Sequence, residues 1–172
     1  MDTETDAIKK ILLVEDDPRD VELALTALEE HRLADQVAVV NDGAEALDYL
    51  YRRGKFQNRP GGDPLLVLLD NKMPKVGGLE VLKVIKTDER LKIIPVVALT
   101  SSRETSDLVE FYKHGVNAYV VKPVDFSEFR NAVKQLGSFW ATVNEPPPQL
   151  ERDESPVQSG KVIISGKKEV KA

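Results

Sequence analysis

Four short apolar runs stand out along the first 140 residues of the chain. They are Ile11–Val14, Leu65–Leu69, Pro95–Leu99 and Ala118–Val121, and each is rich in Val, Leu or Ile. Runs of this length are too short for a buried helix and are typical of strands that are buried on both faces. A weaker run at Val37–Val40 predicts a fifth strand.

Between these runs, apolar residues recur at helical spacing. The predicted helices span Pro18 to about Arg32, Ala44–Arg53, Gly78–Asp88, Thr105–Lys113 and Asp125–Phe139. At the first of them, Asp17 is placed to cap the N-terminus and Pro18 to occupy the first helical position. Alternating strands and helices predict a parallel sheet that is covered on both faces. We therefore expect an α/β fold, a doubly wound five-stranded parallel sheet, over residues 8–143.

The composition changes on either side of this predicted domain. Residues 1–7 are mainly polar and acidic and are expected to form an N-terminal tail. Residues 144–172 are expected to form a Pro-rich C-terminal extension that is flexible or docks on a partner, because Pro146–Pro148 cannot be helical. Its short apolar run, Val162–Ile164, is interpreted either as a disordered or loosely docked segment or as a strand that adds to a partner's sheet edge.

Composition and charge exclude several classes of function. The chain has no cysteine, two histidines and a formal net charge of −5. Disulfides and thiolate sites are therefore excluded, and the basic surface that binds nucleic acid is not expected. No apolar run approaches the roughly 18 residues that span a bilayer. The acidic N-terminus is not a signal peptide, so a soluble cytoplasmic protein without membrane association is expected.

Polar residues directly follow the predicted strands. These residues are Glu15, Asp16 and Asp17 after the first strand, Asp70 after the third, Thr100 after the fourth and Lys122 after the last. In a doubly wound sheet, ligands bind at the carboxyl ends of the strands, so these side chains are expected to converge. Clustered carboxylates repel one another unless a cation neutralises them, and an all-oxygen set without His or Cys suits Mg²⁺.

Such a crevice has the groups that phosphoryl transfer needs. A carboxylate can itself be the nucleophile and form an aspartyl phosphate. A lysine beside it can pair with a carboxylate in the empty site and hold a phosphoryl oxygen in the filled one.

Four motifs, in the right order over about 130 residues, resemble those of response regulator receivers. They are Ile11–Pro18 (ILLVEDDP), Leu68–Gly78 (LLDNKMPKVGG), Ala98–Ser101 (ALTS) and Gly115–Pro123 (GVNAYVVKP). The chain also resembles one subgroup, the small receivers paired with phytochrome-type and related sensor kinases. That second resemblance rests on Gly137–Trp140 (GSFW), Asn144–Pro148 (NEPPP) and the long loop Gly54–Pro64.

The resemblance implies a flavodoxin-like receiver fold with strand order 2-1-3-4-5, and a role for each matching residue. Asp70 would be the phosphoacceptor, Lys122 would contact the phosphoryl group, and Thr100 and Tyr119 would form the switch. Glu15, Asp16, Asp70 and the Lys72 main-chain carbonyl would hold Mg²⁺. The Lys122–Pro123 peptide bond would be cis, which X–Pro bonds permit at modest cost. Tyr119 retains a plainer interpretation as packing, and Trp140 is equally an exposed partner anchor or part of the core.

The resemblance also implies a partner and an output. A sensor histidine kinase, of the phytochrome type in this subgroup, would phosphorylate Asp70. Phosphorylation would reshape the face formed by Thr105–Lys113, Ala118–Val121 and Asp125–Phe139, through which a homodimer is expected. Only about 30 residues follow residue 143, so the output is expected to be a protein contact rather than a DNA-binding or catalytic domain.

Two other functions share parts of this pattern. An aspartate-nucleophile phosphohydrolase also uses Asp and Mg²⁺, but it typically has a second Asp two residues after the nucleophile, where this chain has Lys72. A receiver that acts only as a docking module would not need the complete set of acids, threonine and lysine. Nucleotide-binding α/β proteins are excluded because no Gly-rich phosphate loop follows a strand.

Receivers vary at the position of Lys72, and we expect this residue to influence the lifetime of the phosphoryl group.

Overall fold

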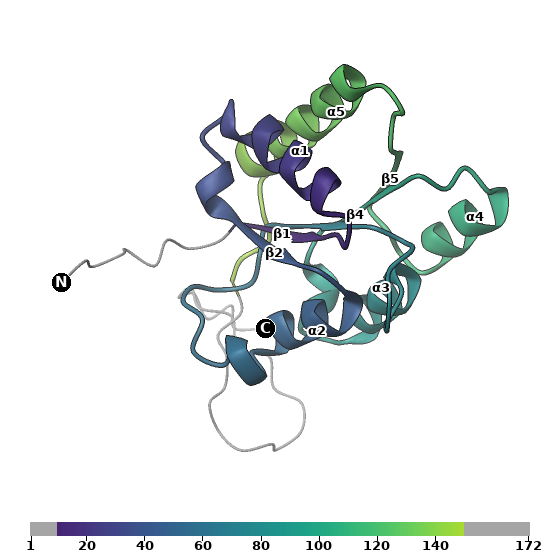
Figure 1. The fold of residues 1–172 in the computed structure, drawn as a ribbon. Helices are drawn as coiled ribbons and strands as arrows, with labels where there is room; N and C mark the ends of the chain where they lie inside the picture. Colours follow the sequence, from purple (N-terminus) through teal and green to yellow (C-terminus); the bar gives the residue numbers. More distant parts are fainter. Residues whose placement is uncertain (1–9, 150–172) are drawn as a thin grey trace, which may run out of the picture.

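A computed structural model of the chain describes residues 10–149 (Figure 1). The strands are β1 (Ile11–Val14), β2 (Val37–Val40), β3 (Leu66–Leu69), β4 (Val96–Thr100) and β5 (Ala118–Val121). They form one parallel sheet in the order β2-β1-β3-β4-β5. The predicted strand order is confirmed, and each predicted strand boundary lies within one residue of the observed one.

Five helices connect the strands and cover both faces of the sheet. They are α1 (Pro18–Glu29), α2 (Gly43–Tyr51), α3 (Gly78–Thr87), α4 (Thr105–Lys113) and α5 (Phe126–Ser138). Figure 1 shows α1 and α5 together on one face, with α2 and α3 on the other. The core residue Phe111 of α4 packs with those of α2 and α3. A π-helical turn, Phe139–Val143, continues α5.

Side chains next to the helix ends explain where three helices begin. Asp17 accepts a hydrogen bond from the Arg19 amide at 2.9 Å, and Pro18 stands in the first turn, as predicted. Asp42 caps α2 in the same way, and Asp125 caps α5. Each capping carboxylate satisfies an amide that has no partner within its own helix.

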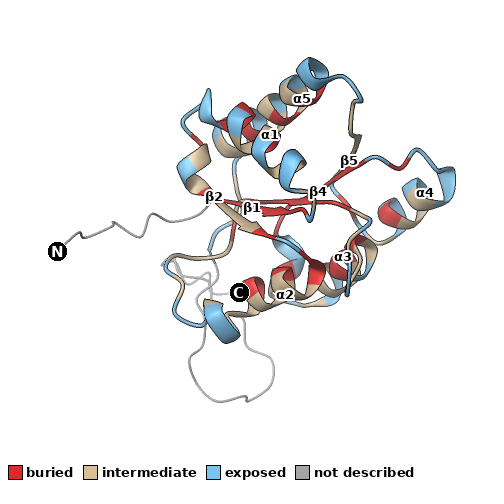
Figure 2. Cartoon of the chain, viewed as in Figure 1, coloured by how far each residue is buried: buried red, intermediate tan, exposed pale blue. Residues whose placement is uncertain are grey.

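The central strands are buried on both faces, which is why they are almost uninterrupted in their apolar character (Figure 2). Every residue of β1, β3 and β4 is buried, whereas β5, at one edge of the sheet, is only half-buried. Leu12 and Val14 face the core beneath α2, α3 and α4. Ile11 and Leu13 face the core beneath α1 and α5. The alternation follows from the two-residue period of a strand.

The register of the sheet brings the ends of its strands level with one another. Val14 pairs with Leu69, so that the next residues, Glu15 and Asp70, emerge side by side from β1 and β3. Thr100 pairs with Val121, which directly precedes Lys122. The polar residues that follow these strands therefore lie together at the carboxyl ends of the strands.

After α5 the chain returns to the other end of the strands, the end at which β3 begins. The side chain of Gln149 accepts a hydrogen bond from the Asp63 amide at 2.9 Å and donates one to the Asp63 carbonyl at 3.4 Å. The first residues of the predicted extension thus lie against the loop that precedes β3. The apolar run Val162–Ile164 lies outside the described residues.

One backbone prediction was wrong. Within residues 10–149 no peptide bond is cis, so the Lys122–Pro123 bond is trans. The trans isomer is the lower in energy for X–Pro bonds, by about 0.5–1 kcal/mol. In the same range, no helix is both long and apolar enough to cross a membrane.

A carboxylate and lysine site at the carboxyl end of the sheet

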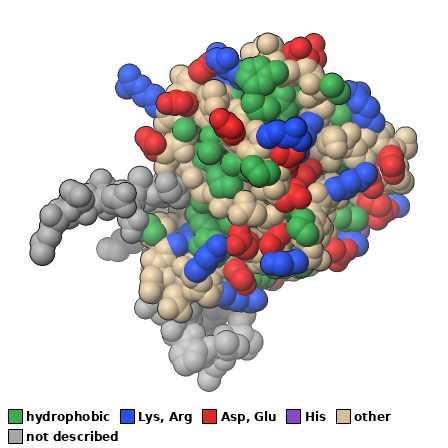
Figure 3. All heavy atoms as spheres, in the orientation of Figure 1, with side chains coloured by type: hydrophobic (Ala, Val, Ile, Leu, Met, Phe, Trp, Pro, Cys, Tyr) green, Lys and Arg blue, Asp and Glu red, His purple; other side chains and the backbone are tan. Residues whose placement is uncertain are grey.

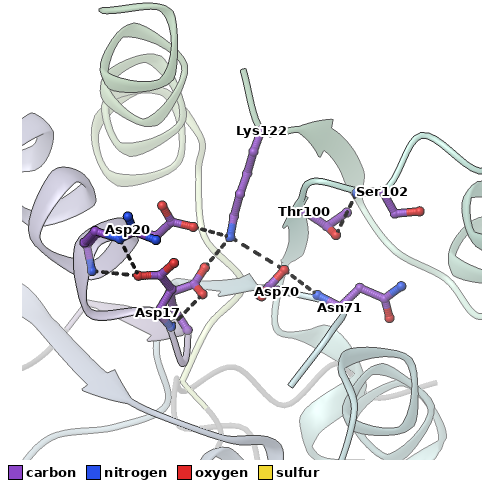
Figure 4. A network of polar contacts seen from close by, with 9 residues as sticks. Asp17, Asp20, Asp70, Asn71, Thr100, Ser102 and Lys122 are labelled. Atoms are coloured by element: carbon purple, nitrogen blue, oxygen red, sulfur yellow. Dashed lines mark hydrogen bonds and ion pairs between the residues drawn. The ribbon is translucent and has the colours of Figure 1, made fainter. Parts of the chain in front are cut away.

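The ammonium group of Lys122 lies among three carboxylates (Figure 4). Its Nζ is 2.5 Å from Glu15 Oε2, 2.9 Å from Asp20 Oδ2 and 3.7 Å from Asp70 Oδ1. Glu15 and Asp70 are buried, and the Lys122 side chain is only 10% exposed. The four residues come from α1 and from the segments that follow β1, β3 and β5, so only the folded sheet brings them together.

Burial dominates the electrostatics of this crevice. Loss of hydration raises the pKa of Glu15 to about 7, although Lys122 acts in the opposite direction. The same loss of hydration raises the pKa of Asp70 against the opposing charge of Lys122. Burial by itself would lower the pKa of Lys122, but hydrogen bonds to Asp20 and Glu15 outweigh it and raise that pKa. One lysine therefore faces more negative charge than it can neutralise.

The surplus negative charge is arranged as a divalent cation would require. Carboxylate oxygens of Glu15, Asp16 and Asp70 lie within 4.8 Å of one another, and Asp16 is exposed to solvent. All the donors are oxygens, which Mg²⁺ and Mn²⁺ prefer. The residues present therefore fit a hard cation. The Lys72 side chain is exposed, and the role of its main-chain carbonyl as a ligand stays a prediction.

Thr100 and Tyr119 lie at the same end of the sheet but do not join the carboxylate cluster through any described hydrogen bond. Thr100 is fully buried, and its Oγ1 accepts a hydrogen bond from the Ser102 amide at 3.3 Å. The hydroxyl of Tyr119 donates to the Ser102 carbonyl at 3.1 Å. The Tyr119 ring packs edge-on against Phe111, with centroids 5.4 Å apart. Tyr119 thus has both a packing contact and a polar link to the segment after Thr100.

The loop after β3 fixes the position of Asp70. Asp70 Oδ1 accepts a hydrogen bond from the Asn71 amide at 2.8 Å, and the Gly78 amide donates to the Asn71 carbonyl at 2.8 Å. A Cβ at Gly78 would lie 2.1 Å from the Asp70 carbonyl oxygen, so α3 can approach the loop only with glycine there. Lys75 adopts a positive φ of 63° and forms an ion pair with Asp42 at 3.2 Å.

Sequence reasoning missed three residues of this region. Asp20 is one of them, because an acid in the first turn of a helix is explained by the helix dipole alone. Ser102 and Asp107 are the others: Asp107 Oδ2 accepts hydrogen bonds from Ser102 Oγ at 2.6 Å and from Asn71 Nδ2 at 3.2 Å. Asp20 stands four residues after Asp16 and faces the same edge of the sheet, which is the signal that could have identified it.

Comparison with known proteins agrees with this architecture. The sequence profile of the response regulator receiver domain matches residues 11–134. The response regulator Rcp1 of Synechocystis sp. is 36% identical over 140 residues, which cover 81% of this chain and 94% of Rcp1. A crystal structure of Rcp1 in its Mn²⁺-bound form matches with a TM-score of 0.75 at 36% identity, over 81% of this chain and 99% of that chain.

Two further solved structures are regulators associated with phytochromes. The phosphorylated cyanobacterial phytochrome response regulator RcpA is 40% identical, with a TM-score of 0.76 over 82% of this chain and 99% of its own. The bacteriophytochrome response regulator AtBRR is 60% identical, with a TM-score of 0.64 over 81% of this chain and 99% of its own. The profile match, the relatives and the five-stranded parallel sheet agree: this chain belongs to the response regulator receiver domain family of two-component signalling.

Proposed function

We propose that this chain is a response regulator that accepts a phosphoryl group from a sensor histidine kinase on Asp70. The observation that carries the proposal is the buried Asp70 carboxylate, 3.7 Å from the Lys122 ammonium and within the acidic cluster that also contains Glu15 and Asp16. In the transfer, an Asp70 oxygen forms a bond to phosphorus as the bond between phosphorus and the kinase histidine breaks.

The residues of the chain would divide the work of this transfer. Glu15, Asp16, Asp70 and the Lys72 carbonyl would hold Mg²⁺. When bound, the cation supplies positive charge that neutralises the transferring group. Lys122 would bind a phosphoryl oxygen, and the hydrogen bond from the Asn71 amide orients the nucleophile. Position and charge would provide most of the catalysis, and the protein would promote its own phosphorylation and dephosphorylation without acting on a separate substrate.

The output would be a change in the face formed by α4, β5 and α5. Thr100 would bond the phosphoryl group and Tyr119 would move with it, because both contact Ser102. The face has exposed apolar side chains, namely Leu108, Val109 and Tyr112 on α4. The same face includes an apolar groove lined by residues of β5, α5 and the π-helical turn that follows α5, among them Val120, Leu136 and Trp140. We propose that a second copy of the chain covers this face.

Charge and similarity indicate the kind of partner. In the view of Figure 3, acidic and basic side chains are interspersed, with no extended basic patch. That pattern and the net charge of −5 favour protein partners over nucleic acid or membrane. The phytochrome-associated relatives support a phytochrome-type kinase as the donor.

We further propose a cytoplasmic location. Residues 8–143 would form the receiver, residues 1–7 a tail and residues 144–172 an extension.

Phosphorylation by a small donor tests the chemistry. The protein is incubated with acetyl phosphate and Mg²⁺, and the phosphorylated fraction is measured by intact mass and by mapping of the modified residue. We expect modification at Asp70, none in Asp70→Asn, and an unchanged extent in the matched surface variant Asp17→Asn. Absence of phosphorylation in the folded wild-type protein would favour a receiver that acts only as a docking module. Steady hydrolysis of small phosphate esters would favour a phosphohydrolase.

Solution mass tests the dimer. The mass is measured by light scattering before and after phosphorylation, or with beryllofluoride as a stable mimic of the phosphoryl group. Tyr112→Asp, on the proposed face, should weaken the dimer, and Ile93→Asp, an exposed apolar residue after α3, should not. A monomer in both states would overturn this part of the proposal.

A further inference from the structure

Asp20 forms a contact with Lys122 that the proposed transfer does not account for. Its carboxylate, from the first turn of α1, accepts a hydrogen bond from Lys122 Nζ at 2.9 Å, and its side chain is 28% exposed. Figure 4 shows Asp20 and Asp70 on opposite sides of the ammonium group. The contact joins residues 102 positions apart in the chain, so no local feature of α1 requires it.

Among residues 10–149, the hydrogen bonds of Lys122 account for two of its three N–H donors. An ammonium group has three N–H donors. Glu15 and Asp20 accept two of them, at 2.5 and 2.9 Å. Asp70 lies at 3.7 Å, which is too long for a hydrogen bond. A phosphoryl group on Asp70 would extend its oxygens into this space and meet the third N–H without a large movement of Lys122.

Asp20 differs from Glu15 in one respect that matters for the loaded site. Glu15 belongs to the set of carboxylates whose oxygens converge as cation ligands, whereas Asp20 does not. A cation would compete with Lys122 for Glu15. Asp20 would then be the carboxylate that still holds the ammonium in place.

We propose that Asp20 is a positioning residue that holds the Lys122 ammonium at the distance from Asp70 needed to receive a phosphoryl oxygen. The inference rests on the proposed function of Asp70. Without Asp20, the ammonium would move toward Asp70 and pair directly with the nucleophile, which would occupy the space of the incoming group and reduce the reactivity of the carboxylate.

Charge alone predicts the opposite effect of Asp20→Asn on phosphorylation. Neutralising Asp20 removes a negative charge near the site of an anionic phosphoryl group, which would favour phosphorylation. Positioning predicts slower phosphorylation instead. Asp17→Asn provides the matched control. It removes one negative charge from the same end of α1, at a residue whose side chain has no hydrogen bond or ion pair with Lys122 among the described contacts. Asn also remains a good helix cap.

The experiment compares Asp20→Asn, Asp17→Asn and wild type in phosphorylation by acetyl phosphate and in affinity for beryllofluoride, both with Mg²⁺. For Asp20→Asn we expect a decrease of about tenfold in rate and affinity, the effect of one charge-assisted hydrogen bond. Asp17→Asn should remain within about twofold of wild type. Asp20→Asn added to a Lys122→Met background should have little further effect, because Asp20 acts through Lys122.

A second measurement needs neither cation nor phosphoryl donor. In metal-free protein, the hydrogen-bonded Lys122 ammonium should give a resolved Nζ–Hζ signal in heteronuclear NMR, assigned by its loss in Lys122→Met. Asp20→Asn should shift or broaden this signal, and Asp17→Asn should leave it in place. Equal or faster phosphorylation in Asp20→Asn, or an unchanged NMR signal, would overturn the inference. Failure of the wild type to become phosphorylated would instead overturn the proposed function.

Discussion

The side-chain amide of Asn71 donates a hydrogen bond to the Asp107 carboxylate at 3.2 Å. Asn71 directly follows the proposed phosphoacceptor, and Asp107 lies in the first turn of α4. The same oxygen of Asp107 accepts a shorter hydrogen bond from Ser102 Oγ, at 2.6 Å. One carboxylate therefore connects the loop after β3, the segment after β4 and the helix at the proposed output face.

Removal of this carboxylate should destabilise the protein. Asp107→Ala leaves the Asn71 amide and the Ser102 hydroxyl without their partner, and we expect a loss of about 1–3 kcal/mol in the free energy of unfolding. Urea denaturation measures the change. Glu104→Ala is the control, because the exposed Glu104 side chain does not cap α4 and its loss should change the free energy by less than about 0.5 kcal/mol. Equal effects of the two variants would contradict a structural tie through Asp107.

Two adjacent glycines should differ sharply in their tolerance of a methyl group. A Cβ at Gly78 would stand 2.1 Å from the Asp70 carbonyl oxygen, whereas one at Gly77 would meet only the Asn71 carbonyl at 3.5 Å. Gly78→Ala should therefore lower the free energy of unfolding by about 1–3 kcal/mol or more, because backbone must move. Gly77→Ala should be nearly neutral. Chemical denaturation of both variants, with the Asp70 phosphorylation rate as a second readout, tests the contrast.

The metal-free protein should lose stability as pH rises from about 4.5 to about 7. Burial raises the pKa of Glu15 from 4.5 to about 7, so over this range the folded protein holds a proton that the unfolded chain has released. The raised pKa of Asp70 acts in the same direction. Thermal unfolding across this range, in the presence of a chelator, measures the effect. Glu15→Gln should flatten the profile, and the exposed-site variant Glu80→Gln should retain it.

Mg²⁺ should restore the stability that ionisation of the site removes. A ligand that binds only the folded state at about 100 times its dissociation constant adds about 2.7 kcal/mol. The gain should be larger at pH 8 than at pH 5.5, because protons compete for the carboxylates that bind the cation. Asp16→Asn should remove most of the gain, and Asp17→Asn should keep it. A Mg²⁺ response that survives Asp16→Asn would place the cation elsewhere.

Lys72 should influence how long a phosphoryl group persists on Asp70. The residue lies two positions after Asp70 with an exposed side chain, where it can affect the approach of water. We expect Lys72→Ala to change the dephosphorylation rate by more than about twofold, measured as the decay of phosphorylated protein after removal of the donor. Lys83→Ala, at a partly exposed lysine on α3, provides the control. A Lys72→Ala rate within twofold of wild type would reject this role.

Particular residues show how far the sequence alone determined the fold. The buried central strands appear as apolar runs because their residues face a core on both sides, and Asp17 and Pro18 mark the start of α1 through local hydrogen bonding and a fixed φ. The order of the strands came from the family resemblance. Phe126 and Phe129 are three residues apart and so share one face of α5, yet Phe126 is 51% exposed and Phe129 is buried. Spacing fixes the face of a helix, but not how far the neighbouring helix covers it.

The candidate site divides in the same way. The residue order alone shows that acids, a hydroxyl and a lysine directly follow the strands, and these residues converge because parallel strands end on the same side of their sheet. Which of these side chains contact one another depends on the packing of the helices on the sheet. The tertiary structure placed Trp140 partly against the core, gave Tyr119 a hydrogen bond to Ser102, left Lys122–Pro123 trans and brought Asp20 to Lys122. Contacts across 102 positions of chain depend on how helices pack on the sheet, and no local pattern of residues encodes that packing.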